Sequence, residues 1–296
     1  MATMKALVYT APNKIELLTR PKPTIQAPTD AIVRIVHASI CGTDLHILKG
    51  DVPSIQPERI LGHEGVGVVE AIGDSVHKFA VGDRVLIASQ TCCGACQFCR
   101  MGIVSHCDEG GWQLGNRVDG TQAEYVRIPH ANLSLHKIPA NIPGRIAIML
   151  SDVLPTGMEC GTLNGNVKPG GSVVIIGAGP IGIGCLLTAR LYSPATLVMV
   201  DVDEARLQQA RTMGAQTVNS KAPGAKEELD RLTDGQGFDT VMEAVGIPVT
   251  FEMAQELVAV GGAIANVGVH GVKVDLRIEQ LWDRNISECL PPRVAS

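Results

Sequence analysis

The segment from residue 172 to residue 189 constrains the fold more than any other part of the chain. An apolar run, Ser172 to Ile176, leads into Gly177-Ala178-Gly179-Pro180-Ile181-Gly182 and then into an apolar stretch of helix length. Glycines at these three positions permit a tight turn, close approach of the backbone to a pyrophosphate and close packing of helix on strand. The pattern is weak evidence by itself, but the strand before it and the helix after it predict a nucleotide-binding βαβ unit.

An acidic residue lies where such a unit needs one. Asp201 directly follows Leu197 to Val200, the predicted second strand. A carboxylate at this position can accept hydrogen bonds from both ribose hydroxyls and would repel a 2′-phosphate, so the sequence predicts NAD rather than NADP. The alternative is a glycine-rich turn joined to an ordinary surface aspartate.

Two domains are expected from a chain of 296 residues. From Gly171 onward apolar strands alternate with segments of helix length, which is typical of a parallel sheet. The strands are predicted at 172–176, 196–200, 216–219, 240–243 and 263–267, and the clearest helix runs from Asp203, its N-cap, to Met213. The first 150 residues are β-rich, with strands predicted at 31–36, 65–71, 84–87 and 123–128, so the fold class is α/β.

Four cysteines are grouped at spacings that suit a metal. Cys93, Cys96, Cys99 and Cys107 follow one another at intervals of three, three and eight residues. Four thiolates complete the tetrahedral shell of zinc and leave no open position, so the predicted role is structural. Cys92 is a spare thiol whose spacing fits less well, and the alternative is a set of free or disulfide-paired cysteines.

Composition narrows the class of protein. The net charge is −5 and the basic residues are scattered singly, which argues against nucleic acid as a partner. The uncharged run from 169 to 189 is interrupted by glycines and a proline, so it is not expected to be a membrane helix. With nine cysteines, an odd number, and no signal-like start, the chain is expected to be cytoplasmic.

A second group of potential metal ligands lies in the β-rich half. Cys41-Gly42-Thr43-Asp44-Leu45-His46 precedes Gly62-His63-Glu64, and a third ligand has to come from a distant segment, for which Asp152 is the candidate. Taken singly, Cys41 would be a small buried hydrophobe and His63 a core histidine. The other histidines lack ligand spacing and are interpreted as ordinary: His37, His77, His106, His130, His136 and His270.

Together these motifs resemble the zinc-dependent medium-chain alcohol dehydrogenases, and Cys41, His63-Glu64 and Asp152 look like the bacterial secondary-alcohol branch. The resemblance extends from Met4 to about Ser287. It implies a GroES-like catalytic domain at 1–152 and a Rossmann NAD-binding domain at 153–287. It also implies a homodimer or homotetramer and a small, secondary alcohol or ketone as substrate.

The resemblance also implies roles for single residues. Cys41, His63 and Asp152 would bind a catalytic zinc, while Glu64 would be a neighbouring carboxylate that can enter the metal shell. Thr43 and His46 would relay the alcohol proton. Further residues would contact the cofactor or substrate: Thr156 and Val267-Gly268-Val269 at the nicotinamide, Arg206 near the adenosine ribose, and Trp112 in the substrate pocket.

The end of the chain departs from the family pattern. Residues 288–296 look like an atypical tail, and the segment that returns to the catalytic domain is expected to be missing. Pro291 and Pro292 cannot donate ladder hydrogen bonds, which argues against the sixth strand of the sheet. Alternatives are a dehydrogenase for a polyol, formaldehyde or an amino-alcohol, an inactive zinc- and nucleotide-binding fragment, and a zinc-free quinone reductase.

Overall fold

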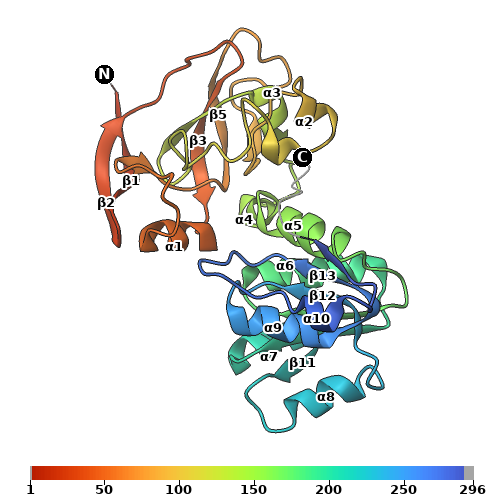
Figure 1. The fold of residues 1–296 in the computed structure, drawn as a ribbon. Coiled ribbons are helices and arrows are strands. Elements are labelled where there is room, and N and C mark those ends of the chain that lie inside the picture. The colour runs from red at the N-terminus through yellow and green to blue at the C-terminus, as the bar shows by residue number, and fades with distance from the viewer. Residues whose placement is uncertain (1, 290–296) are drawn as a thin grey trace. The chain divides into compact units, whose positions relative to one another are not determined.

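The computed structural model describes residues 2–289, and the chain divides into two compact units. The first unit ends at Asp152 and the second begins at Val153. Figure 1 shows the first in red to yellow-green and the second in green to blue. Each unit has a hydrophobic core of its own.

Two antiparallel sheets form the first unit, with strand orders β2-β1-β4 and β7-β3-β5-β6-β8. In β3, Ala31, Val33 and Ile35 alternate along the strand and all contact one core, as expected for a sheet with one buried face. The bounds are β1 Thr3–Ala11, β2 Lys14–Pro21, β3 Ala31–Ala38, β4 Arg59–Ile60, β5 Gly65–Ile72, β6 Arg84–Ile87, β7 Tyr125–Ile128 and β8 Leu135–Lys137.

The helices of this unit are short, and α1 (Gly42–Lys49) was not predicted from the sequence. Cys41 caps its start and Asp44 completes a capping box, while Gly50 ends it in the left-handed region at φ 85°. The helix therefore begins directly after a candidate metal ligand. The others are α2 Gln97–Arg100, η1 Val104–His106, α3 Ala131–Ser134, α4 Gly144–Ala147 and η2 Ile148–Leu150.

The second unit is built on one parallel sheet with strand order β11-β10-β9-β12-β13-β14. This is the order of a doubly wound dinucleotide-binding fold, in which ligands bind at the carboxyl ends of the central strands. The strands are β9 Ser172–Ile176, β10 Thr196–Asp201, β11 Gln216–Asn219, β12 Phe238–Glu243, β13 Val258–Asn266 and β14 Ser287–Cys289. The helices are α5 Val153–Thr156, η3 Gly157–Leu163, α6 Pro180–Ala189, η4 Arg190–Tyr192, α7 Glu204–Thr212, α8 Ala225–Arg231, α9 Pro248–Leu257 and α10 Ile278–Leu281.

Most of the elements expected in this unit are present. Strands β9 and β11 have the predicted bounds, and the Asp203 side chain caps α7 by accepting from the backbone of Ala205 and Arg206. Strand β13 begins earlier than predicted and ends at Asn266, which leaves Val267 in the following loop. In the first unit, β7 begins at Tyr125 rather than at Ala123, which forms only an isolated bridge. Over residues 2–289 no helix is long and apolar enough to cross a membrane.

The sheet continues to the last described residues. Strand β14 pairs in parallel with β13, Ser287 with Ala263 and Cys289 with Ala265. The expectation that no strand forms here is therefore wrong for residues 287–289, because their backbone amides are free to join the ladder. Pro291 and Pro292 lie outside the described residues.

Candidate functional site

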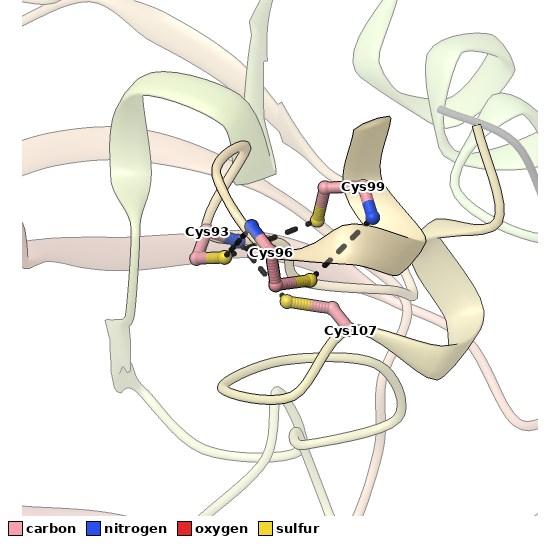
Figure 2. A group of neighbouring side chains, drawn as sticks. All are labelled: Cys93, Cys96, Cys99 and Cys107. Carbon is pink, nitrogen blue, oxygen red and sulfur yellow. Dashed lines mark hydrogen bonds between the residues drawn. The ribbon is translucent and has the colours of Figure 1, made fainter. Parts of the chain in front are cut away.

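The four grouped cysteines form a compact cluster, the thiol clasp, made of Cys93, Cys96, Cys99 and Cys107. Figure 2 shows their sulfur atoms facing a common centre, and all four lie within 4.8 Å of one another. Gly94 and Gly102 have positive φ values of 75° and 74°, so the loop can reverse at these points. The set of donors suits tetrahedral zinc with a closed shell. Cys92 is buried nearby but is not a member of the four-sulfur group.

Backbone amides of the same loop point at the sulfurs. Cys93 N–H donates to Cys107 Sγ at 3.3 Å, and Cys99 N–H donates to Cys96 Sγ at 3.5 Å. The bond from Cys99 N–H, with help from Asp108 N–H, lowers the pKa of the Cys96 thiol to about 6. Burial has the opposite effect on Cys107 and raises its pKa to about 12. Backbone hydrogen bonds thus favour the thiolate of Cys96 while burial disfavours that of Cys107, and a metal that binds thiolates must displace protons from the thiols.

The second cluster brings together Cys41, His63, Glu64 and Asp152, whose ligand atoms also lie within 4.8 Å of one another. Asp152 Oδ2 lies 3.1 Å from His63 Nε2 and 3.8 Å from Cys41 Sγ. Cys41 stands at the start of α1, while His63 and Glu64 precede β5. Three distant segments of the first unit thus converge on one point, which we call the Cys–His–Asp site.

Glu64 provides a test of whether a metal fits this site. Its side chain is buried, and its Oε2 accepts a hydrogen bond from Ser39 Oγ at 2.5 Å. Its Oε1 has no hydrogen-bond partner among the described residues and lies 4.0 Å from His63 Nε2. A buried carboxylate oxygen without a partner is costly, and a cation beside it removes that cost. The thiol, imidazole and carboxylate donors suit zinc with an open fourth position.

Burial and neighbouring charges shift the pKa values of this site. Burial raises the pKa of Glu64. For His63, burial alone would lower the pKa, but hydrogen bonds to Asp152 and Cys41 raise it well above its usual range. Asp44, on the first turn of α1, is also buried, which raises its pKa; it accepts from Cys41 N–H and Gln122 Nε2, each at 3.0 Å. Asp44 thus fixes the backbone of Cys41, a role that the sequence motif alone did not reveal.

Helix α1 carries the two residues expected to relay protons. Thr43 Oγ1 lies 3.6 Å from Cys41 Sγ, so the hydroxyl is adjacent to the Cys–His–Asp site. His46 follows one turn later, and its Nδ1 lies 2.9 Å from Asp51 Oδ2. Asp51 therefore orients the imidazole, and nothing in its sequence spacing had singled it out.

Trp112 stands against the candidate ligand His63. The two rings meet edge to face with centroids 6.3 Å apart and planes inclined at 75°. The indole also packs on an apolar cluster that includes Tyr9 and Ile47. Its Nε1 is buried and has no hydrogen-bond partner in the part of the chain that the structure describes. Trp112 is therefore both a core residue and a wall next to the Cys–His–Asp site.

The glycine loop lies at the carboxyl end of β9 in the second unit. Gly177 has φ 104°, and a Cβ on Gly182 would lie 1.8 Å from Gly177 O, so both positions require glycine. Gly179 caps α6, Pro180 is at its first turn and Ile181 follows. A Cβ on Gly179 would meet no atom within 4 Å, so this backbone is open to a ligand. The loop has the geometry that a pyrophosphate requires at a helix N-terminus.

Asp201 is held next to this loop. Its carboxylate accepts from the backbone amides of Ala178 at 2.7 Å, Val202 at 2.7 Å and Asp203 at 2.9 Å. Arg206 Nη1 lies 4.0 Å from Asp201 Oδ2, while the Arg206 side chain is 56% exposed. The structure therefore brings Asp201 and Arg206 to the same end of the glycine loop.

The remaining candidates also belong to the second unit. Val267, Gly268 and Val269 follow β13 at the carboxyl edge of the sheet. Thr156 ends α5, the helix in which Val153 packs against α6 at Gly184. Within residues 2–289, the six histidines interpreted as ordinary belong to neither metal-ligand group.

Comparison with known proteins identifies the family of the chain. The model of the alcohol dehydrogenase GroES-like domain matches residues 27–140, and the model of the zinc-binding dehydrogenase domain matches residues 180–288. An alcohol dehydrogenase of Cupriavidus necator is 35% identical over 98% of this chain and 84% of its own length.

Solved structures agree in fold. A zinc-dependent alcohol dehydrogenase from Streptococcus pneumonia, in its apo form, superposes with a TM-score of 0.94 at 49% identity over 99% of this chain and 84% of that one. A protein of Sinorhizobium meliloti, described as a zinc-binding dehydrogenase and solved with NADP, has a TM-score of 0.85 at 28% identity over 98% of this chain and 84% of that one. The chain belongs to the zinc-dependent medium-chain alcohol dehydrogenases, oxidoreductases that use zinc and a nicotinamide cofactor.

Proposed function

We propose that this chain interconverts a small secondary alcohol and its ketone, with NAD as the hydride partner, at the Cys–His–Asp site. The observation that carries the proposal is the convergence of Cys41, His63 and Asp152, with a fourth, orphaned carboxylate oxygen on Glu64. Three protein ligands leave zinc an open position, which is the arrangement of catalytic rather than structural sites. The thiol clasp, with its closed shell, is proposed to have a structural role only.

The roles of the residues follow from their contacts. Zinc at this site supplies a Lewis acid that lowers the pKa of an alcohol hydroxyl, and the nicotinamide supplies the hydride acceptor. Cys41, His63 and Asp152 would hold the metal, while Ser39 restrains Glu64 beside it through the 2.5 Å hydrogen bond. Thr43, next to Cys41, would accept the alcohol proton. His46, oriented by Asp51, would pass it towards solvent, because an imidazole can both accept and donate a proton through its ring nitrogens.

Cofactor choice is proposed to rest on Asp201. The carboxylate is fixed by three backbone amides, so it can face a ribose without losing its orientation. A 2′-phosphate would meet this negative charge, which favours NAD. One solved relative holds NADP, so the preference has to come from the individual residues of this chain. Arg206, Thr156 and the 267–269 segment are proposed as further cofactor contacts, and Gly177 to Gly182 as the pyrophosphate loop.

An apolar wall favours a small alkyl alcohol over a polyol or amino-alcohol. Trp112 covers one side of His63 with its ring and packs on Tyr9 and Ile47, and the one polar atom of the indole, Nε1, offers a single donor. A polyol would lose the hydration of several hydroxyls at this wall and gain at most one partner from the indole.

Two wider properties form part of the proposal. Apolar side chains after β13 are strongly exposed, among them Val272, Ile278 and Trp282, which supports self-association into a homodimer or homotetramer. Within residues 2–289 no two of the nine cysteines are joined in a disulfide, and the five cysteines of the two clusters would bind metal as thiolates, which supports the reducing cytoplasm. Light scattering on the purified chain measures the first property directly.

A substrate panel tests the proposed activity. The zinc-loaded chain is mixed with NAD and with matched primary, secondary, polyhydric and amino-alcohols, and NADH formation is followed by absorbance. We expect the highest kcat/KM for a short secondary alcohol and loss of activity when a chelator removes the metal. Turnover of polyols alone would replace the proposed substrate class, and no turnover with any alcohol would overturn the proposal.

A further inference from the structure

Glu243, the last residue of β12, is a buried acid that the proposed function does not use. It is 0% exposed. An ionised carboxylate in such a place is costly unless hydrogen-bond donors surround it. Its Oε1 accepts from the backbone amides of Val245 and Gly246, each at 2.9 Å, and its Oε2 from Gly246 at 3.2 Å. The side chain therefore fixes the loop that follows β12.

The backbone of the same residue fixes a second loop. Glu243 O accepts from Val267 N–H at 2.7 Å and from Gly268 N–H at 2.9 Å, at the point where the chain leaves β13. The two loops touch through their backbones, because a Cβ on Gly268 would lie 2.3 Å from Gly246 N and 2.4 Å from Glu243 Oε2. Glu243 thus holds the loops after β12 and β13 together, and we call these two loops the loop pair.

His270 also contacts the loop pair. Its Nε2 lies 2.9 Å from Asn266 Oδ1 and 3.5 Å from Glu243 Oε2. Both neighbours are acceptors, so Nε2 carries the proton. The ring packs edge to face on Phe251 at a centroid distance of 5.7 Å. The 267–269 segment is therefore held at both ends, by the backbone of Glu243 and by the His270 side chain.

The position of the loop pair in the sheet indicates which part of the cofactor it could contact. In a doubly wound sheet a dinucleotide spans the carboxyl edge across the first strand, with one nucleotide on each side. Asp201, on β10, marks the adenosine side. On the other side β12 lies next to β9, with Glu243 opposite Ile176, and Val245 contacts the position of Gly177. The loops after β12 and β13 consequently lie where the nicotinamide half of the cofactor would bind.

We propose that Glu243 and His270 are positioning residues that set the place of the 267–269 segment for the nicotinamide half of the cofactor. The inference rests on the proposed function. It predicts a selective effect: a change at either residue weakens binding of the complete dinucleotide and leaves binding of ADP-ribose, which lacks only the nicotinamide ring, unchanged. ADP-ribose keeps the groups that the glycine loop and Asp201 would hold.

The test compares dissociation constants for NADH and ADP-ribose by calorimetry, using zinc-loaded full-length chain. Glu243→Gln keeps the shape of the side chain but turns an amide NH2 towards backbone donors. His270→Ala removes the ring, His270→Gln restores an N–H donor, and Glu227→Gln, an exposed change on α8, is the control. For Glu243→Gln and His270→Ala we expect the Kd of NADH to rise about tenfold while that of ADP-ribose stays within about twofold. His270→Gln should recover part of the loss.

Two other outcomes overturn the inference. An unchanged Kd for NADH in both variants, or an equal loss for both ligands together with a lower melting temperature, would leave Glu243 and His270 with a role in stability alone. A wild-type chain that binds neither ligand would instead contradict the proposed function, and the inference that rests on it would fail for that separate reason.

Discussion

Asp152 Oδ2 lies 3.1 Å from His63 Nε2, although 89 positions separate the two residues in the sequence. The same oxygen lies 3.8 Å from Cys41 Sγ, so one carboxylate contacts both other members of the proposed zinc site. Replacing Asp152 is therefore the substitution that tests the proposed zinc site most directly.

Asp152→Ala should remove zinc from the Cys–His–Asp site and leave the clasp loaded. The variant keeps Cys41 and His63 and has only Glu64 left to replace the lost carboxylate, so this site should bind zinc more weakly than with its full ligand set. Metal analysis after gel filtration should fall from two zinc ions per chain to one, in line with the two donor clusters. Asp74→Ala, which alters an exposed acid of the same unit, should keep both ions. Two zinc ions in both Asp152→Ala and Asp152→Ala/Glu64→Gln would exclude Asp152 as a ligand.

Stabilisation by zinc should increase with pH. In the metal-free fold the pKa of His63 is raised, so its protonated form stabilises that fold at low pH, and this contribution is lost as pH rises through the raised pKa. Zinc needs the neutral ring and must displace the proton, so its affinity rises over the same range. The gain in melting temperature on adding zinc should be larger at about pH 8 than at about pH 6. The difference between wild type and Asp152→Ala isolates this site from the clasp, and a pH-independent difference would contradict the assignment.

The clasp should stabilise the first unit without taking part in chemistry. Cys96→Ser removes the thiol whose pKa is lowered to about 6, the sulfur best prepared to bind metal. We expect the free energy of unfolding to fall by ~3 kcal/mol or more, since a structural metal contributes directly to folding. Cys92→Ala is the comparison variant, because Cys92 is buried in the same cluster but lies outside the four-sulfur group, and alanine adds no polar atom there. Denaturant titration should find a clearly smaller loss in Cys92→Ala than in Cys96→Ser, and equal losses in both variants would contradict the choice of ligands.

Cofactor preference should change when Asp201 is replaced. Asp201→Ala removes the charge that would repel a 2′-phosphate and releases Arg206, 4.0 Å away, to meet it. Hydrogen bonds to a charged group contribute roughly 1.5–3 kcal/mol, so the ratio of kcat/KM for NAD over NADP should drop about 10- to 100-fold. Asp203→Asn, which keeps the helix cap, should preserve the ratio. An unchanged ratio in Asp201→Ala would remove Asp201 from the account of cofactor choice.

Local sequence patterns predicted those elements whose signals are local. The buried strand β9 and the capped helix α7 agree with prediction, because an apolar run determines the first and a cap with a glycine stop the second. The edge strand β11 also has the predicted bounds, although only Val218 in it is buried. Helix α1 was missed since it has only eight residues, and its bounds depend on Cys41 and Gly50 rather than on apolar periodicity. Strand β14 differs from the prediction because a proline lacks an amide hydrogen only at its own position, and Ser287 to Cys289 keep theirs for the ladder with β13.

The sites were predictable in their ligand types but not in their supporting contacts. Cysteine spacing predicted the clasp. Asp152, which no local motif marks, is the candidate for a third ligand because it lies at the domain boundary, and the resemblance implies the same residue. The partners Ser39, Asp44 and Asp51 emerged only from the fold. Ser39 bonds to Glu64 across 25 positions and Asp44 to Gln122 across 78, and such bonds leave no signal in spacing. Asp51 lies only five positions from His46, but no motif marks that pair. The joining of two loops by Glu243 is of the same kind.

The most direct test of the central claim follows a single hydrogen atom. Zinc-loaded chain is incubated with NAD and a secondary alcohol that carries deuterium on its carbinol carbon, and the reduced cofactor is analysed by mass spectrometry. The account predicts one deuterium in the reduced nicotinamide, and no reduced cofactor from the Asp152→Ala variant. Reduced cofactor without deuterium, or no reduced cofactor from wild type with any alcohol, would contradict direct hydride transfer at the Cys–His–Asp site.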